Sequence, residues 1–266
     1  MSQRSIRSPQ KRLKYPWLFA LRNGELPPII SCYGTEYQLR QVFKHDFFAA
    51  TGLYAGPAGQ VVAKFGRTSD FLSLPLAWAG DLLETREYRV LEQAQDIPGV
   101  PRLVGRVGEN VLVREFVPGH PLGRREAVSD SFFEELGAIL RALHARHIAY
   151  VDLNKRQNIL VGDDGRPYLI DFQISLHLPP TGWRRAWPVR RILARFQQAD
   201  LYHYLKHKRR LRPDLLTPAE RARVERLGLW IRLHRLLARP LTHLRRGILA
   251  RLRTDEAEAV PGSGAK

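Results

Sequence analysis

The chain has 266 residues and a formal net charge of +17, because 43 Lys and Arg face only 26 Asp and Glu. Apolar residues make up 44% of it, which indicates a folded protein with room for one domain or two small lobes. The single cysteine, Cys32, excludes an internal disulfide and favours a reducing cytoplasm, and no apolar run approaches the roughly 20 residues that span a bilayer. The charge favours a polyanionic partner without choosing among nucleic acid, anionic lipid and a phosphorylated ligand.

The first half of the chain is expected to form a small antiparallel sheet with one helix. Residues 1–34 are basic and interrupted by prolines, and they predict an irregular arm. Apolar and β-branched runs around a Gly-Pro turn then predict a hairpin. The predicted elements are strands within 37–65, including hairpin strands 47–54 and 60–65, a helix over 79–95, a strand beginning within 97–105 and another over 110–117. They define an N-terminal lobe over 35–118.

The second half is expected to be mainly helical. Residues 130–148 place Phe133, Leu136 and Leu140 at helical spacing, which predicts a helix with one buried face. Two short strands follow, joined by the turn sequence at 162–167, and the chain after 185 is Arg-rich and helical in pattern. A helical lobe is therefore predicted over 119–253, ending in basic amphipathic helices and followed by a disordered polar tail over 254–266.

A polar turn lies between two short apolar runs, in "YVDLNKRQNILV" at 150–161, and "YLIDFQ" follows at 168–173. A carboxylate in such a turn, Asp152, can accept a hydroxyl proton, and Asn158 and Asp171 can hold a cation against phosphate oxygens. These are the parts that phosphoryl transfer needs, because it depends mainly on positioning and charge neutralisation. Upstream, "VVAK" ends in Lys64 on a predicted strand, and Glu87 lies on the inward face of the predicted helix.

These segments together resemble the protein kinase-like superfamily. "VVAK" is similar to its lysine strand, "YVDLNKRQN" to its catalytic loop, "IDFQ" to its metal-binding Asp-Phe-Gly, and "REFVPGHPL" to its hinge. More narrowly, the chain resembles the small bacterial branch that includes lipopolysaccharide core (Kdo/heptose) kinases and RIO-type kinases. The resemblance spans roughly 40–210. It implies an α+β, bilobal fold with ATP bound between a small antiparallel-sheet lobe with one helix and a mainly helical lobe.

The resemblance also implies roles for the residues of the polar turn. Asp152 would orient or deprotonate the acceptor hydroxyl, and Lys155 would neutralise the transferring phosphoryl group. Asn158 and Asp171 would bind Mg²⁺. The expected cofactors are thus ATP and Mg²⁺.

Nucleotide contacts are expected from the sheet lobe. Lys64 would hold the α- and β-phosphates, and Glu87 would pair with it. The Gly-rich loop of the superfamily is missing, and "FKHDF" at 43–47 stands in its place, so Lys44 and His45 are expected to cover the phosphates. The hinge that would receive adenine consists of Glu115, Phe116 and Val117.

The chain departs from the family pattern at several positions. Tyr150 and Val151 precede Asp152 in place of His-Arg, which argues against activation through a loop phosphate. Asn158 is six positions after Asp152, one more than usual, so either the loop bulges or Gln157 takes the metal-binding role. Gln173 replaces the glycine after Asp-Phe. No Ala-Pro-Glu segment follows, which argues against an extended peptide substrate.

Simpler interpretations compete with each assignment. Asp152 alone is typical of a turn cap, and Lys64 alone is typical of a solvated strand residue. Glu84 competes with Glu87 for Lys64. Asp200 either braces the catalytic loop or is a carboxylate on a helix surface.

Several functions remain open from the sequence. A kinase that phosphorylates a glycolipid sugar or a protein Ser/Thr is favoured, and a nucleotide-binding pseudokinase or scaffold is the alternative. Residues 226–253 carry Trp, Leu and Arg at helical spacing, which is typical of helices packed on the larger lobe with a solvated Arg face. The alternative is that these residues, with the apolar stretch 71–83, bring a cytoplasmic protein into peripheral contact with the anionic inner membrane. No RNA-binding motif is found, so nucleic acid is disfavoured.

Overall fold

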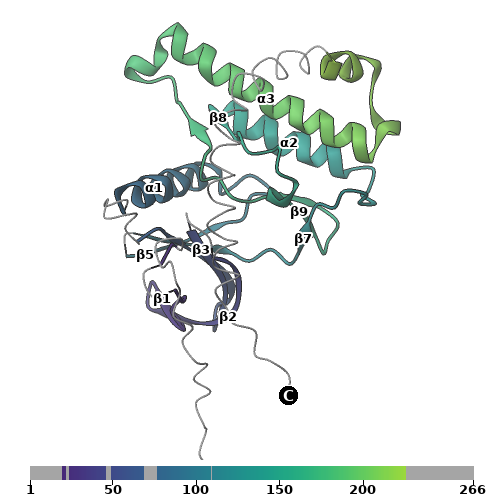
Figure 1. The fold of residues 1–266 in the computed structure, drawn as a ribbon. Coiled ribbons are helices and arrows are strands. Elements are labelled where there is room, and N and C mark those ends of the chain that lie inside the picture. Colours follow the sequence, from purple (N-terminus) through teal and green to yellow (C-terminus); the bar gives the residue numbers. More distant parts are fainter. Residues whose placement is uncertain (1–19, 22–23, 46–48, 69–76, 109, 226–266) are drawn as a thin grey trace, which may run out of the picture.

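The computed structural model describes residues 20–21, 24–45, 49–68, 77–108 and 110–225. These residues form a curled antiparallel sheet with one helix, followed by a mainly helical second part (Figure 1). The expected α+β, bilobal arrangement is therefore confirmed. No helix in the described ranges combines the length and apolar character needed to cross a bilayer. The expected basic helices beyond 225 and the tail 254–266 lie outside the described residues.

The sheet of the first lobe has six strands in the order β1-β2-β3-β4-β6-β5, and each neighbouring pair is antiparallel. Its two edge strands, β1 and β5, contact each other, so the sheet curls strongly (Figure 1). The predicted hairpin is present as β3 and β4. The strands are β1 (Ile29–Cys32), β2 (Thr35–His45), β3 (Ala49–Gly56), β4 (Gly59–Gly66), β5 (Leu103–Val107) and β6 (Val111–Glu115).

Strand β1 corrects the prediction that residues 1–34 form an irregular arm. Ile30 and Cys32 are buried while Ile29 and Ser31 are exposed, which is the alternation of a half-buried strand. β1 pairs with β2 through a two-residue turn in which Tyr33 and Gly34 have φ of 48° and 80°. Positive φ at both positions is typical of the tight hairpin turns that match strand twist. The prolines that precede Ile29 concealed this hairpin in the sequence.

Helix α1 (Ala77–Ala94) lies between the sheet and the second lobe (Figure 1). Val90, Leu91 and Ala94 are buried, as the apolar stripe predicted. The same inward face carries Glu84 and Glu87, which are only 3% and 1% exposed. Because isolated buried carboxylates are costly, this face of α1 must meet cations.

The second lobe is built on two long helices, α2 (Phe132–Ala145) and α3 (Trp187–Leu211), which pack against each other. Its core includes the predicted helical stripe, with Phe133, Leu136 and Leu140 all fully buried. Short strands and 3₁₀ turns support the loops between the helices: β7 (Gly119–Pro121), β8 (Ile148–Ala149), η2 (Arg156–Asn158), β9 (Ile159–Gly162), β10 (Pro167–Leu169), β11 (Leu176–His177), η3 (Gly182–Arg185) and η4 (Pro213–Leu215). Residues 218–225 are helical again.

Candidate active site

Lys64 forms two ion pairs, one with helix α1 of its own lobe and one with the second lobe. It lies near the end of β4, opposite Leu112 of β6. Its ammonium nitrogen is 2.7 Å from a carboxylate oxygen of Glu87 in α1 and 2.7 Å from one of Asp171, which follows β10. The Lys64 side chain is 14% exposed and that of Glu87 only 2%. Three residues far apart in the sequence therefore meet where the sheet, α1 and the second lobe come together.

The charges in this cluster stabilise one another. Burial alone would raise the pKa of Asp171, but the positive charges of Lys64, Lys44 and Lys155 hold that pKa below its ordinary value. Burial would lower the pKa of Lys64, but Glu87 and Asp171 raise it above its ordinary value. Lys64 and Asp171 are thus both ionised at neutral pH. A desolvated ion pair contributes little net stability, and such clusters are concentrated at functional sites.

Glu87, and not Glu84, is the partner of Lys64. The second carboxylate oxygen of Glu87 accepts a hydrogen bond of 3.3 Å from the backbone N–H of Phe172, so Glu87 holds both the lysine and the residue after Asp171. Glu84 forms an ion pair of 3.4 Å with Arg106 instead. The alternative pairing left open by the sequence is therefore not the one in the structure.

The polar turn holds Asp152 between an amide and an ammonium group. The Asn158 side-chain nitrogen donates a hydrogen bond of 3.0 Å to Asp152, and the Lys155 ammonium is 2.6 Å from the same carboxylate oxygen. The 3₁₀ turn η2 ends at Asn158. Asn158 is buried and Gln157 is exposed, so Asn158 is the residue that the turn directs into the site.

A hairpin brings the turn beside Asp171. In the pairing of β9 with β10, Ile159 is opposite Leu169, and the backbone N–H of Ile170 donates a hydrogen bond of 3.0 Å to the Asn158 carbonyl. Asp171 follows directly and has a φ of 64°. Positive φ is uncommon for residues other than glycine and turns the chain out of the strand direction. Asp171 is therefore not simply the end of a strand, because its backbone is bent where it meets Lys64.

Tyr150 links the turn that contains Asn158 to the segment that leads into Asp171. Its buried hydroxyl donates a hydrogen bond to the carbonyl of Ile170, and its ring packs edge-on against Phe172 with centroids 5.1 Å apart. Burial raises the pKa of Tyr150 well above its ordinary value, so the hydroxyl remains a donor. Tyr150 thus fixes the backbone next to Asp171.

Asp200 braces the backbone next to Asp152, and it is not a surface carboxylate. Its fully buried side chain accepts hydrogen bonds of 2.7 Å from the backbone N–H groups of both Tyr150 and Val151, and it is 3.1 Å from His144. Val151 has a φ of 71°, which is a strained conformation for a β-branched residue. Two charge-assisted hydrogen bonds from α3 therefore hold the strained backbone that immediately precedes Asp152.

Asp200→Asn is expected to lower the free energy of unfolding by about 3 kcal/mol, because an amide can accept at only one oxygen and its NH₂ group would face a buried donor. Urea denaturation measures this difference. The matched control is Asp214→Asn, since Asp214 is an exposed partner of Arg212 and should change stability little. Equal effects of the two substitutions would show that Asp200 does not hold the loop.

The predicted nucleotide-binding residues of the sheet lobe are only partly brought together. Lys44, near the end of β2, is close enough to Asp171 to lower its pKa. The His45 ring nitrogen instead accepts a hydrogen bond of 3.4 Å from the backbone N–H of Leu21. The connection after His45, residues 46–48, lies outside the described residues, so the expected phosphate cover remains a prediction.

The predicted hinge is the segment that crosses from β6 to β7. Glu115 is exposed, and the backbone N–H of Phe116 donates to the carbonyl of Gln60 at 3.3 Å. The Phe116 ring stacks on Phe43 with centroids 6.3 Å apart. Within the described part of the chain, Val117 makes no hydrogen bond. Binding of adenine at this segment remains a prediction.

Arg114 was missed by the sequence analysis. In the register of β4 with β6 it is opposite Val62, so it shares a sheet face with Lys64, and its guanidinium donates a hydrogen bond of 3.3 Å to the Glu115 carbonyl. Burial lowers its pKa, while the charges of Glu87 and Asp171 act in the opposite direction. Arg114 is therefore a second cation beside these carboxylates. An arginine at an inward position of the apolar strand "VLVRE" was the available signal.

The donor set suits a magnesium ion. Mg²⁺ binds oxygen ligands and commonly uses only one or two protein side chains, with substrate phosphates and water completing its shell. The Asp171 carboxylate and the Asn158 carboxamide oxygen are of the required type. No group of three or more His, Cys, Asp or Glu is arranged for a metal within the described ranges. A cation here would accordingly depend on nucleotide phosphates for its remaining ligands.

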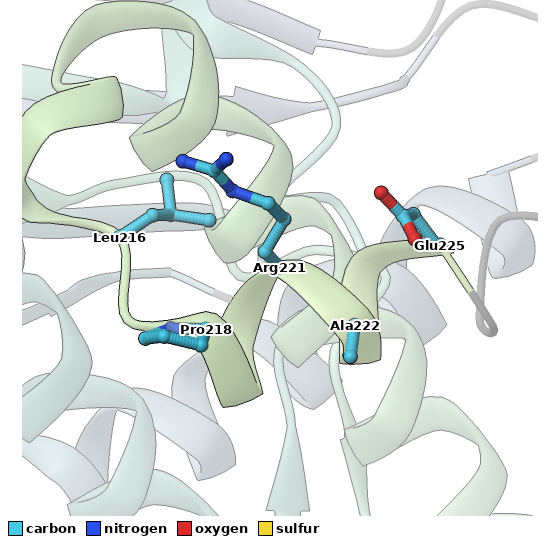
Figure 2. Close-up of a pocket in the computed structure, with 5 residues that line it drawn as sticks. All are labelled: Leu216, Pro218, Arg221, Ala222 and Glu225. Atoms are coloured by element: carbon cyan, nitrogen blue, oxygen red, sulfur yellow. The ribbon is translucent and has the colours of Figure 1, made fainter.

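An open pocket elsewhere contains none of these residues. The pocket is formed by the part of the chain after α3, between the loop at Leu216 and the helical residues 218–225 (Figure 2). Its lining residues are Leu216, Pro218, Arg221, Ala222 and Glu225. We therefore place the candidate active site at the Lys64 cluster and not at this pocket.

No protein-family model and no curated protein matches the chain. Among solved structures, the chain is similar to a Rio2 kinase from Chaetomium thermophilum, described as an ADP/Mg²⁺–phosphoaspartate complex, with 16% sequence identity and a TM-score of 0.48. The match covers 70% of this chain and 61% of that chain, so it spans less than two thirds of that protein. A likeness at this level concerns the overall fold at most, and the roles of the residues depend on the contacts described above.

Proposed function

We propose that the protein is an ATP-dependent phosphotransferase that transfers the γ-phosphoryl group to an alcohol hydroxyl. The observation that carries this proposal is the position of Lys64, 2.7 Å from both Glu87 and Asp171, beside a loop that holds Asp152. Phosphoryl transfer requires little covalent participation by the protein and depends on positioned charges. The cluster supplies a cation for phosphates, carboxylates and an amide for Mg²⁺, and a carboxylate base.

Each group has a defined part in the transfer. A lysine ammonium has three N–H donors, and two of them are directed at Glu87 and Asp171, which leaves the third for a nucleotide phosphate. The acceptor oxygen forms a bond to the γ-phosphorus as the bond to the ADP oxygen breaks. Asp152 takes the proton of the acceptor hydroxyl. Lys155, whose side chain is 51% exposed, is positioned to exchange its contact with Asp152 for the transferring group.

Asn158 and Asp171 would hold the Mg²⁺ ion. Bound there, the ion neutralises charge on the β- and γ-phosphates during transfer. The hydrogen bond from the Asn158 nitrogen to Asp152 directs the carboxamide oxygen, and not its nitrogen, towards other ligands. The low pKa of Asp171 keeps its carboxylate ionised for metal binding.

The acceptor is proposed to be a sugar hydroxyl of an anionic glycolipid of the lipopolysaccharide type, with a protein Ser or Thr as the other class. A net charge of +17 favours an anionic acceptor. The missing Ala-Pro-Glu segment argues against an extended peptide. This choice implies a cytoplasmic protein that meets its acceptor at a membrane surface.

The test is transfer of labelled phosphate. The purified protein is incubated with Mg²⁺, γ-labelled ATP and a cell extract, and the lipid and protein fractions are then counted separately. We expect label in the glycolipid fraction and its loss on chelation of Mg²⁺. Label in protein alone would reverse the choice of acceptor. Nucleotide binding without transfer to either fraction would contradict the proposed function and support a nucleotide-binding scaffold.

A further inference from the structure

Exposed aromatic and cationic side chains gather on η3 and the first turns of α3. Trp183 is 72% exposed, Trp187 68% and Ile192 51%. Single exposed apolar residues are ordinary, but a group of them marks an interaction site. We call this group the Trp–Arg surface. It consists of five exposed residues and the partly buried Arg184; the exposed ones are Trp183, Trp187, Arg191, Ile192 and Arg195.

The geometry of α3 places most of these residues on its outward side. Leu193 and Asp200 are buried and mark the side that faces the protein. Successive residues of a helix are 100° apart, so residues four apart form a row. Trp187, Arg191 and Arg195 form one such row, on the side away from Leu193. The guanidinium of Arg191 lies over the Trp187 ring, 5.4 Å from its centroid.

Acidic residues are missing from the whole segment. Residues 172–199 contain neither Asp nor Glu. The arginines of this segment are Arg184, Arg185, Arg190, Arg191 and Arg195. The stretch from the end of the Asp171 loop to the middle of α3 is therefore uniformly cationic and suited to an anionic partner.

We propose that the Trp–Arg surface docks on an anionic lipid bilayer. Tryptophan favours the boundary between headgroups and acyl chains, and arginines pair with lipid phosphates. Ile192, which follows Arg191 directly and is half exposed, adds apolar surface next to the row that begins at Trp187. This inference does not depend on the proposed chemistry, since none of these residues belongs to the active site.

The aliphatic side chain of Ile192 favours a bilayer over nucleic acid. A single-stranded RNA would also use arginines and would stack its bases on tryptophan. Ile192, which is 51% exposed, offers no ring for a base to stack on. In a bilayer its burial is favourable in itself, because it removes apolar surface from water.

Co-sedimentation of the full chain with phosphatidylcholine vesicles, with or without phosphatidylglycerol, tests the proposal. We expect binding to the anionic vesicles only. An arginine near an anionic surface strengthens binding about fivefold, so Arg191→Gln with Arg195→Gln should weaken binding roughly 25-fold. Trp183→Ser with Trp187→Ser should weaken it as well and remove part of the blue shift in tryptophan fluorescence. All four side chains are exposed, so the fold should persist.

The matched control is Arg221→Gln with Arg223→Gln, which removes the same charge from exposed positions outside the surface and should cause a much smaller loss. Asp152→Asn should bind vesicles like the unchanged protein even if it transfers no phosphate, which separates docking from catalysis. Unchanged binding after both surface substitutions would overturn the proposal. The proposal would also be overturned if the protein did not bind anionic vesicles but bound RNA through Trp183 and Trp187.

Discussion

Asp152→Asn is expected to reduce the rate of phosphoryl transfer about a thousandfold, because an amide cannot accept the proton of the acceptor hydroxyl. The substitution keeps the size of the side chain and leaves an oxygen for Lys155 or Asn158. Mg·ATP should therefore bind with an affinity within roughly twofold of the original. Single-turnover assays with labelled ATP and calorimetric titration measure the two quantities.

The control for Asp152→Asn makes the same chemical change on the surface. Asp163 lies in the exposed turn between β9 and β10, and Asp163→Asn should transfer phosphate at the original rate. Full activity of Asp152→Asn would remove this carboxylate from the mechanism. Equal loss in both variants would point to a general effect on the fold.

Lys64→Met is expected to lower kcat/KM for ATP about a hundredfold or more, because a charge that neutralises the phosphates is lost. It also leaves Glu87, which is 2% exposed, without its cation. Loss of one partner from a buried ion pair costs about 3 to 5 kcal/mol. A loss of activity in Lys64→Met alone could therefore come from the missing phosphate contact or from a less stable fold.

A double substitution separates the two effects. Adding Glu87→Gln to Lys64→Met removes the uncompensated buried charge, so the urea midpoint should recover much of its original value. Activity should not recover, because no cation has returned. Recovery of phosphate transfer in the double variant would show that Lys64 acts through stability alone.

The arrangement of the sheet lobe could be predicted where local pattern and tertiary packing agree. The hairpin of β3 and β4 has a Gly-Pro turn between apolar runs, and α1 has an apolar stripe that is buried as expected. β1 was missed because its pairing depends on the backbone at Tyr33 and Gly34, which composition does not reveal. Four residues that follow prolines carry too little pattern for a strand to be distinguished from a loop.

Most residues of the candidate site could be predicted from the sequence, but the pairs that they form with one another could not. Spacing alone could not decide between Asn158 and Gln157, because the answer lies in the 3₁₀ turn η2 that buries one and exposes the other. Glu84 and Glu87 are both buried on α1, so helical periodicity could not separate them. Only the position of Arg106 in β5 shows why Glu84 pairs elsewhere. Arg114 was overlooked because a single charged residue near the end of an apolar strand is usually solvent-exposed.

Helix α3 carries most of the Trp–Arg surface, in its first turns, and also Asp200, which holds the backbone next to Asp152. It runs without a break from Trp187 to Leu211, and Asp200 lies 13 residues along it, which corresponds to about 20 Å at 1.5 Å per residue. At that distance from the first turn of α3, Asp200 holds the backbone of Val151. The start of α3 and the backbone before Asp152 are therefore joined by one continuous helix.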